Sequence, residues 1–248
     1  MSGHSKWATI KHKKAALDAK RGKAFTRIIK EITIAARGGG DPDGNPRLRT
    51  AVLAAKAASM PAENIKRAIQ RGTGELDGGQ IDEVMFEGYG PGGTAVLVEV
   101  ATDNRNRTVS EIRHMFSKHG GKLGEQNSVA RLFERKSQIM VPLEKATEEQ
   151  LMNVVLDAGA EDIRDDGVHW EIISPTEAHE PVLNALQKAG IAPSEAHLGR
   201  IPNTLIKLEG KDAATMLRLA EALEDYEDVQ NVYTNFDIDE SVMEALAE

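Results

Sequence analysis

The sequence contains no cysteine, and aromatic residues make up only 4% of its 248 positions. A chain without thiols forms no disulfide, no cysteine-ligated zinc finger and no thiol nucleophile, which fits a reducing compartment. Because aromatic side chains are scarce, any hydrophobic cores must be built mainly from aliphatic ones. The length exceeds the usual size of a single core and indicates two or three domains.

Long apolar runs are also missing. The longest, such as 51–55 and 94–98, are far shorter than the roughly 20 residues that a helix needs to cross a bilayer. The basic start of the chain is not followed by an apolar stretch, which argues against a secretory signal. We therefore expect a cytoplasmic protein with no membrane partner.

Signatures of catalysis are scarce. The seven histidines are scattered with no His-x-x-x-His pair, and no Gly-x-Ser-x-Gly nucleophile motif occurs. The glycine-rich segment 88–93 lacks the Gly-Lys-Ser/Thr ending of a phosphate loop and precedes a predicted strand, so a turn is favoured. We therefore expect no enzyme, no catalytic residue, no metal site and no cofactor.

The charge, in contrast, is divided sharply along the chain. Residues 1–71 hold 16 lysine and arginine side chains against five aspartate and glutamate, whereas the remaining residues hold 15 against 34. The net charge of −8 thus combines a basic first third with an acidic remainder. A basic module on an acidic protein is typical of polyanion binding, with nucleic acid as the expected partner.

Within this basic third, we expect the first 27 residues to contact nucleic acid. Lysine and arginine side chains would neutralise phosphates, while Trp7 and His12 could stack on bases or pack on sugars. The alternative is a solvated basic helix whose Trp7 packs on the rest of the domain. The candidate residues are Lys6, Trp7, Lys11, His12, Lys13, Lys14, Lys20, Arg21, Lys23 and Arg27.

A second basic cluster, with Arg105 and Arg107, precedes a predicted helix. Free N–H groups at a helix N-terminus attract phosphate, so these arginines could add a second nucleic-acid contact. Alternatively, they pair with the acidic body, and the neighbouring asparagine and aspartate residues are simply turn formers. The sequence leaves both readings open.

The first third has helical periodicity and predicts a three-helix domain with a basic N-terminal arm, residues 1–78. One helix should end at Gly38-Gly39-Gly40, a second should begin at Asn45 and Pro46, and a third should run from Pro61 to a stop at Gly72. No helix-turn-helix with an evident base-reading face stands out.

Beyond a glycine-rich connector, strands and helices alternate, which predicts an α+β fold. Residues 137–201 have the order β-α-β-β-α-β of a ferredoxin-like domain. The flanking segments supply β-α-β on each side, with strands at 94–101, 128–133 and 204–208 and a helix at 108–120 that a Thr108–Glu111 capping box should begin. We therefore expect one ferredoxin-like domain (136–201) inserted into another (79–135 and 202–248), the alternative being one larger α+β domain with a continuous sheet.

Several motifs resemble those of the YebC/PmpR family over essentially the whole chain. They are Ser2-Gly3-His4-Ser5-Lys6-Trp7, Ile10-Lys11-His12-Lys13-Lys14, Tyr89-Gly90-Pro91-Gly92-Gly93 and Thr102-Asp103-Asn104-Arg105-Asn106-Arg107-Thr108. The resemblance implies a three-domain cytoplasmic protein and a probable DNA-binding transcriptional regulator. It also implies a competing role, since relatives include a mitochondrial translational activator of cytochrome c oxidase and ribosome-associated factors that relieve stalling.

Together these features predict a non-enzymatic regulator of gene expression that binds nucleic acid through its basic third. Duplex DNA and ribosomal RNA within the ribosome both remain open as the target, because lysine-rich segments contact phosphates without specifying sequence. The acidic domains would limit non-specific binding and offer a surface to a protein partner. A membrane-surface or scaffold protein and an unrecognised enzyme are the other classes considered.

Overall fold

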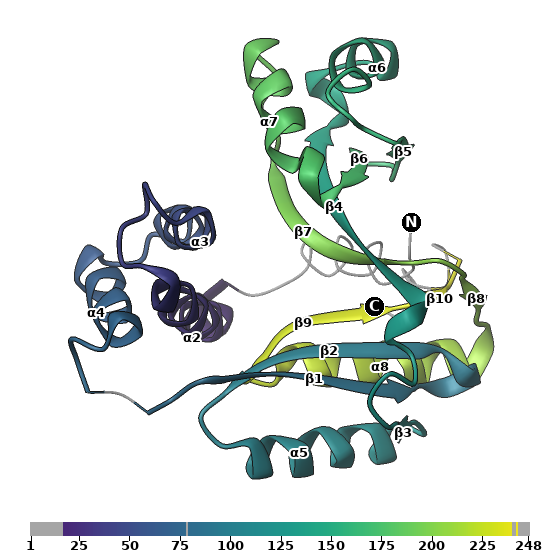
Figure 1. The fold of residues 1–248 in the computed structure, drawn as a ribbon. Helices are drawn as coiled ribbons and strands as arrows, with labels where there is room; N and C mark the ends of the chain where they lie inside the picture. The colour runs from purple at the N-terminus through teal and green to yellow at the C-terminus, as the bar shows by residue number, and fades with distance from the viewer. Residues whose placement is uncertain (1–16, 78, 240–241, 243–248) are drawn as a thin grey trace.

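The computed structural model describes residues 17–77, 79–239 and 242, with side chains from residue 22 onward. A helical bundle (α2, α3 and α4) lies beside a sheet backed by helices α5 and α8, and a second sheet with helices α6 and α7 rises from it (Figure 1). The predicted α+β fold, with a helical domain and two ferredoxin-like domains, is confirmed.

The bundle consists of α2 (Leu17–Ala35), the short 3-10 helix η1 (Ala36–Gly38), α3 (Pro46–Ala57) and α4 (Ala62–Thr73). Its core is aliphatic, as the composition predicted, with Ile32, Leu48 and Ala55 fully buried. The predicted start of α3 is confirmed. The Asn45 side chain accepts a hydrogen bond from the Leu48 N–H, and proline occupies the first turn, where its missing N–H costs nothing.

The end of α4 differs from the prediction by two residues. Gly72 does not stop the helix, which continues to Thr73 and is capped by Gly74 in the left-handed conformation at φ 81°. Gly72 serves packing instead: a Cβ there would lie 2.3 Å from the backbone oxygen of Thr33. The absence of a side chain therefore lets α4 approach α2 closely.

The first ferredoxin-like domain is a sheet with the strand order β3-β1-β2-β9, in which neighbouring strands are antiparallel. Helices α5 and α8 cover one face and enclose a core that includes Val96, Phe116 and Met216. The elements are β1 (Asp82–Tyr89), β2 (Ala95–Thr102), α5 (Arg105–Lys118), β3 (Lys122–Leu123), α8 (Gly210–Asp225) and β9 (Val229–Thr234).

The connectivity of this domain differs from the predicted one. The segment expected as a strand at 204–208 yields only β8 (Ile206–Lys207), which pairs in parallel with β10 (Phe236–Asp237) in a separate small sheet. Its place in the larger sheet is taken by β1, which reaches its neighbour β2 through a hairpin. The spatial order is thus ferredoxin-like, but the strand between β2 and β3 comes from earlier in the chain.

The strand expected at 128–133 is also wrong. Residues Ala130–Leu132 form the 3-10 helix η3 instead. The buried Glu87 carboxylate accepts hydrogen bonds from the backbone N–H groups of Asn127, Val129 and Ala130, at 2.6 to 2.8 Å. These N–H groups are therefore not available to a strand ladder.

The inserted domain has the predicted β-α-β-β-α-β order, with antiparallel strands arranged β5-β6-β4-β7. In the described part of the chain its sheet is separate from the first, so the alternative of one continuous sheet is wrong. Its elements are β4 (Phe133–Pro142), α6 (Glu148–Val155), β5 (Asp162–Asp165), β6 (His169–Pro175), α7 (His179–Lys188) and β7 (Glu195–Pro202). Across the described residues, every helix is too short or too polar to span a membrane.

Candidate nucleic-acid interface

Most of the predicted nucleic-acid contacts come from the N-terminal arm. Lys6, Trp7, Lys11, His12, Lys13 and Lys14 lie outside the described residues. Lys20 and Arg21 belong to α2, where only their backbone is described. The predictions for these residues therefore stay predictions.

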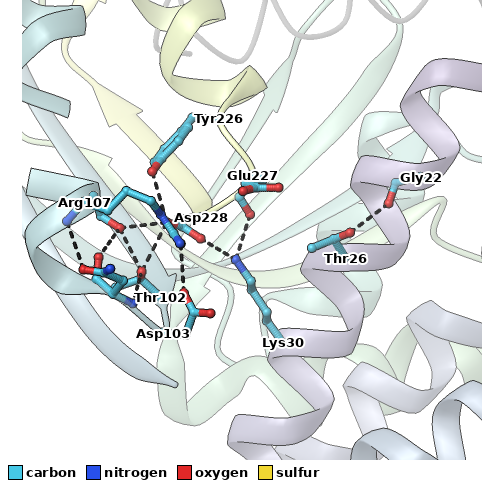
Figure 2. A network of polar contacts seen from close by, with 11 residues as sticks. Gly22, Thr26, Lys30, Thr102, Asp103, Arg107, Tyr226, Glu227 and Asp228 are labelled. Carbon is cyan, nitrogen blue, oxygen red and sulfur yellow. Dashed lines mark hydrogen bonds and ion pairs between the residues drawn. The ribbon is translucent and has the colours of Figure 1, made fainter. Parts of the chain in front are cut away.

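Further along α2, three basic side chains follow one another at helical spacing and face the acidic body. Lys23, Arg27 and Lys30 lie four and three residues apart, which places them on one side of the helix. Lys23 Nζ lies 3.7 Å from a carboxylate oxygen of Asp225, and Lys30 Nζ lies 2.6 Å from Asp228 Oδ1. Lys30 also donates to the backbone oxygen of Glu227 at 3.1 Å (Figure 2). This face of α2 is therefore neutralised within the molecule.

Arg27 lies half-buried between these two lysines. Burial lowers the pKa of its guanidinium, while the Glu224 and Asp225 carboxylates nearby oppose that shift. Two of the predicted phosphate contacts, Lys23 and Arg27, thus lie next to carboxylates in this structure.

Asp228, immediately before β9, is the centre of the polar network in Figure 2 and is only 1% exposed. Although burial opposes ionisation, hydrogen bonds from Lys30, Thr108 and Arg107 lower the pKa of Asp228 to about 2. The carboxylate is therefore ionised at neutral pH. Its described hydrogen-bond donors come from the bundle and from the first ferredoxin-like domain: Lys30, Thr102, Arg107, Thr108 and Tyr226.

The predicted capping box at Thr108 and Glu111 is wrong, because α5 begins three residues earlier. Asn104 is the N-cap, and its side chain accepts a hydrogen bond from the Arg107 N–H at 3.1 Å. Thr108 lies inside the helix, where its hydroxyl donates to Asp228 at 2.7 Å. The hydrogen bond to the buried carboxylate thus gives a role to Thr108, which was predicted from the sequence to cap the helix.

The two arginines of the second basic cluster have different surroundings. Arg107 pairs with Asp103 at 2.8 Å and with Asp228 at 3.2 Å, and these partners raise its pKa. Arg105 is exposed in the first turn of α5 and makes no ion pair with a described residue. Pairing with the acidic body, one of the two readings left open, therefore describes Arg107 but not Arg105.

Two further arginines, neither of them predicted from the sequence, join the bundle to the first ferredoxin-like domain. Arg47 pairs with Glu31 at 2.8 Å and with Glu83 at 2.6 Å, and these hydrogen bonds raise its pKa. Arg37 donates to the backbone oxygen of Ile81 at 2.6 Å. Their partners lie 16 to 44 residues away, so no local pattern could have indicated these contacts.

A different set of basic residues has no ion-pair partner among the described residues. Its members are exposed and lie at the end of α3 and along α4: Lys56, Lys66, Arg67 and Arg71. None was a candidate in the sequence analysis. The alternation of cations with Ile65 and Ala68 at helical spacing is the signal that could have found them.

No cluster of histidine, aspartate and glutamate that could hold a metal ion lies within the described ranges. The inserted domain does bring Ser137 Oγ within 2.8 Å of His179 Nδ1. Ser137 is completely buried, so its hydroxyl has no access for a substrate. The pair is therefore a contact within the core of the inserted domain.

These observations define a class of α+β protein in which a basic helical bundle is docked on a ferredoxin-like domain that carries a second ferredoxin-like domain as an insertion. The chain belongs to the TACO1/YebC family. Residues 5–75 match the model of the TACO1/YebC protein N-terminal domain, and residues 81–236 match that of the TACO1/YebC second and third domain. The family resemblance predicted from the sequence motifs is confirmed.

Similar proteins carry a consistent description. A protein from Solibacter usitatus is 70% identical over the full length of both chains, and one from Koribacter versatilis is 63% identical over the full length of both. Each is named a probable transcriptional regulatory protein. The crystal structure of a conserved hypothetical protein from Aquifex aeolicus is 47% identical, with a TM-score of 0.85 over 93% of this chain and 96% of that one.

Proposed function

We propose that this protein binds DNA through its basic helical domain and regulates transcription without catalysing a reaction. The observation that carries the proposal is the separation of charge at residue 71, between a strongly basic first third and an acidic remainder. Such a division is the electrostatic footprint of a polyanion-binding module. The names of the full-length relatives support transcription as the process.

The distribution of ion pairs supports a division of labour within the basic domain. Lys23, Lys30 and Arg47 are used to dock the bundle on the acidic domains. We infer that the lysines of the arm are among the cations left for a ligand, and their phosphate contacts would position DNA without reading its sequence. Sequence preference then has to come from base contacts or from the deformability of the DNA.

Binding can be measured by fluorescence anisotropy on a DNA duplex of about 30 base pairs, between about 50 and 200 mM salt. The wild type should bind with a strong salt dependence, and Lys11→Glu/Lys13→Glu/Lys14→Glu should weaken binding at least about tenfold. A matched control, Lys145→Glu/Lys188→Glu/Lys211→Glu, makes the same charge change at exposed lysines of the acidic domains. Equal losses in both variants would show that net charge, and not the arm, governs binding.

The cellular target is tested by sedimenting a lysate through a sucrose gradient at physiological salt. A transcriptional regulator should remain in the light fractions or follow DNA fragments. Co-migration with ribosomes that the arm reversal abolishes would overturn DNA as the target and identify ribosomal RNA in its place.

A further inference from the structure

The bundle contains two helices joined by a short turn. Helix α3 ends at Ala57 and α4 begins at Ala62, so residues 58–61 form the whole connection. Within it Ser59 adopts the left-handed conformation with φ 59°, and Pro61 immediately precedes the new helix. A turn of this length between helices is typical of helix-turn-helix units, in which the second helix contacts the nucleic acid. No such unit was predicted from the sequence, because this segment shows no evident base-reading face.

In the structure, α4 has two opposite faces. Ile65 and Ala68 are buried in the bundle core, and Gly72 allows the close approach to α2. Three cations, Lys66, Arg67 and Arg71, are exposed on the other side. The only acid within α4 is Glu63, in its first turn, and Glu75 follows the helix.

These cations are not used to stabilise the bundle. Lys66, Arg67 and Arg71 form no ion pair with any residue that the structure describes, in contrast to Lys23 and Lys30 on α2. Arg67 and Arg71 are four residues apart on the helix, where like charges repel and destabilise it. Glu63, four residues before Arg67, and Glu75, four residues after Arg71, offset part of this repulsion, but no described ion pair engages the three cations.

The docking of the bundle decides where this face points. Because α2 is held against the acidic domains through Lys30 and Asp228, it occupies the side of the bundle toward the sheet, and α4 lies on the side away from it (Figure 1). A polyanion approaching α4 therefore avoids the carboxylates that would repel it. Lys56, at the end of α3, adds positive charge next to the turn.

We propose that the outer face of α4, together with Lys56, contacts the sugar–phosphate backbone of a nucleic acid. The inference rests on the proposed nucleic-acid binding and adds a second contact surface, separate from the N-terminal arm. From Lys66 to Arg71 the helix rises about 7.5 Å, close to two nucleotide steps of about 3.4 Å along one strand. Long lysine and arginine side chains at this spacing can reach phosphates of one strand.

The test replaces the three cations of α4 by neutral side chains of good helix propensity, Lys66→Gln/Arg67→Gln/Arg71→Gln. On duplex DNA each lost phosphate contact reduces the slope of log affinity against log salt by about 0.9, so the slope should become shallower by about 2 to 3. The control Lys145→Gln/Lys188→Gln/Lys211→Gln should keep the wild-type slope. Circular dichroism reports whether each variant folds.

The same measurement on a structured RNA of similar length distinguishes the two sources of phosphate. If the slope of log affinity against log salt changes on only one of the two nucleic acids, that one is identified as the ligand. If the wild type binds and the arm reversal weakens binding, but the α4 variant keeps the wild-type slope on both, this inference alone is overturned. A wild type that binds neither nucleic acid overturns the proposed function and the inference together.

A second variant keeps the test decisive if the triple variant does not fold. Glu63→Gln removes the acid within α4 at an exposed position. It should raise affinity severalfold at low salt, because it removes repulsion of the phosphates. Unchanged affinity in this variant would then count against the α4 surface.

Discussion

Lys30 Nζ lies 2.6 Å from Asp228 Oδ1, and this ion pair joins residues 198 positions apart in the chain. The lysine side chain is 15% exposed and the aspartate side chain 1%, so water screens the pair only weakly. It links the first described helix of the bundle to the residue immediately before β9 in the first ferredoxin-like domain. Together with the contacts of Arg37 and Arg47, this ion pair joins the basic bundle to the acidic body.

Removing the lysine should therefore destabilise the protein markedly. Lys30→Met leaves the buried Asp228 carboxylate without one of its charged partners, at a cost of about 2 to 3 kcal/mol, since Arg107 still compensates part of the charge. Urea unfolding at pH 7 measures the loss. Lys23→Met is the matched control on the same face of α2. Its ion pair is half exposed and 3.7 Å long, so the cost should stay below about 1 kcal/mol. Equal costs would contradict a special role for Asp228.

Asp228 should also make stability depend on pH in the acid range. Its pKa is lowered in the folded state from an ordinary value of 3.8 to about 2. The stabilisation is therefore fully present above about pH 4 and is lost as the pH falls toward 2, with a total of roughly 2 kcal/mol. Thermal unfolding between pH 5 and 2 should show Asp228→Asn losing less stability than the wild type over this range. Parallel curves for the two proteins would exclude this carboxylate as a source of acid sensitivity.

The start of α3 and the contact between Thr108 and Asp228 show which structural features can be predicted from local sequence. Asn45 before Pro46 indicated the start of α3 correctly, because an N-cap depends on neighbouring residues alone. Thr108 was assigned to a cap because its actual partner, Asp228, follows 120 residues later. Long-range polar contacts leave no periodic pattern, so the docking of the bundle could not be predicted.

Glu87 gives a second example of a buried carboxylate that organises distant backbone. Glu87→Gln should cost about 1.5 to 3 kcal/mol, because a neutral amide oxygen replaces the charged acceptor for the N–H groups of Val129 and Ala130. Hydrogen exchange of these two amides should accelerate together with that of Asn127. The exposed Glu111→Gln on α5 serves as the control and should leave both stability and exchange unchanged. Unaltered exchange in Glu87→Gln would show that the segment holds its shape without the carboxylate.

The positions of the strands along the chain could also be predicted better than their pairing in the sheet. The apolar run at 94–101 correctly located β2, whereas the expected strand at 128–133 failed because Glu87 binds its N–H groups. Tertiary packing decides that β1, and not 204–208, pairs at this position of the sheet.

Substitutions of Arg105 and Arg107 should have different effects, the first on DNA binding and the second on the stability of the fold. Arg105→Gln changes an exposed side chain without a described ion pair, so it should leave the urea midpoint unchanged. If the second basic cluster contacts phosphate, the salt slope of DNA binding should fall by about 0.9. Arg107→Gln removes a partner of buried Asp228 and should lower the urea midpoint. Wild-type binding and salt slope in Arg105→Gln would remove this cluster from the interface.

Two glycines that differ only in their surroundings test the packing of the bundle. Gly72→Ala places a Cβ 2.3 Å from the Thr33 backbone oxygen and 2.6 Å from Ala36 Cβ, so α4 must move away from α2. Overpacking of this kind should destabilise the bundle by about 1 to 3 kcal/mol. Gly22→Ala, on α2, meets nothing within 4 Å and should instead stabilise the helix by up to about 1 kcal/mol, because alanine restricts the unfolded chain. Urea unfolding followed at 222 nm measures both. Opposite signs are expected from the same chemical change, and a stabilising Gly72→Ala would show that α4 and α2 are not in close contact.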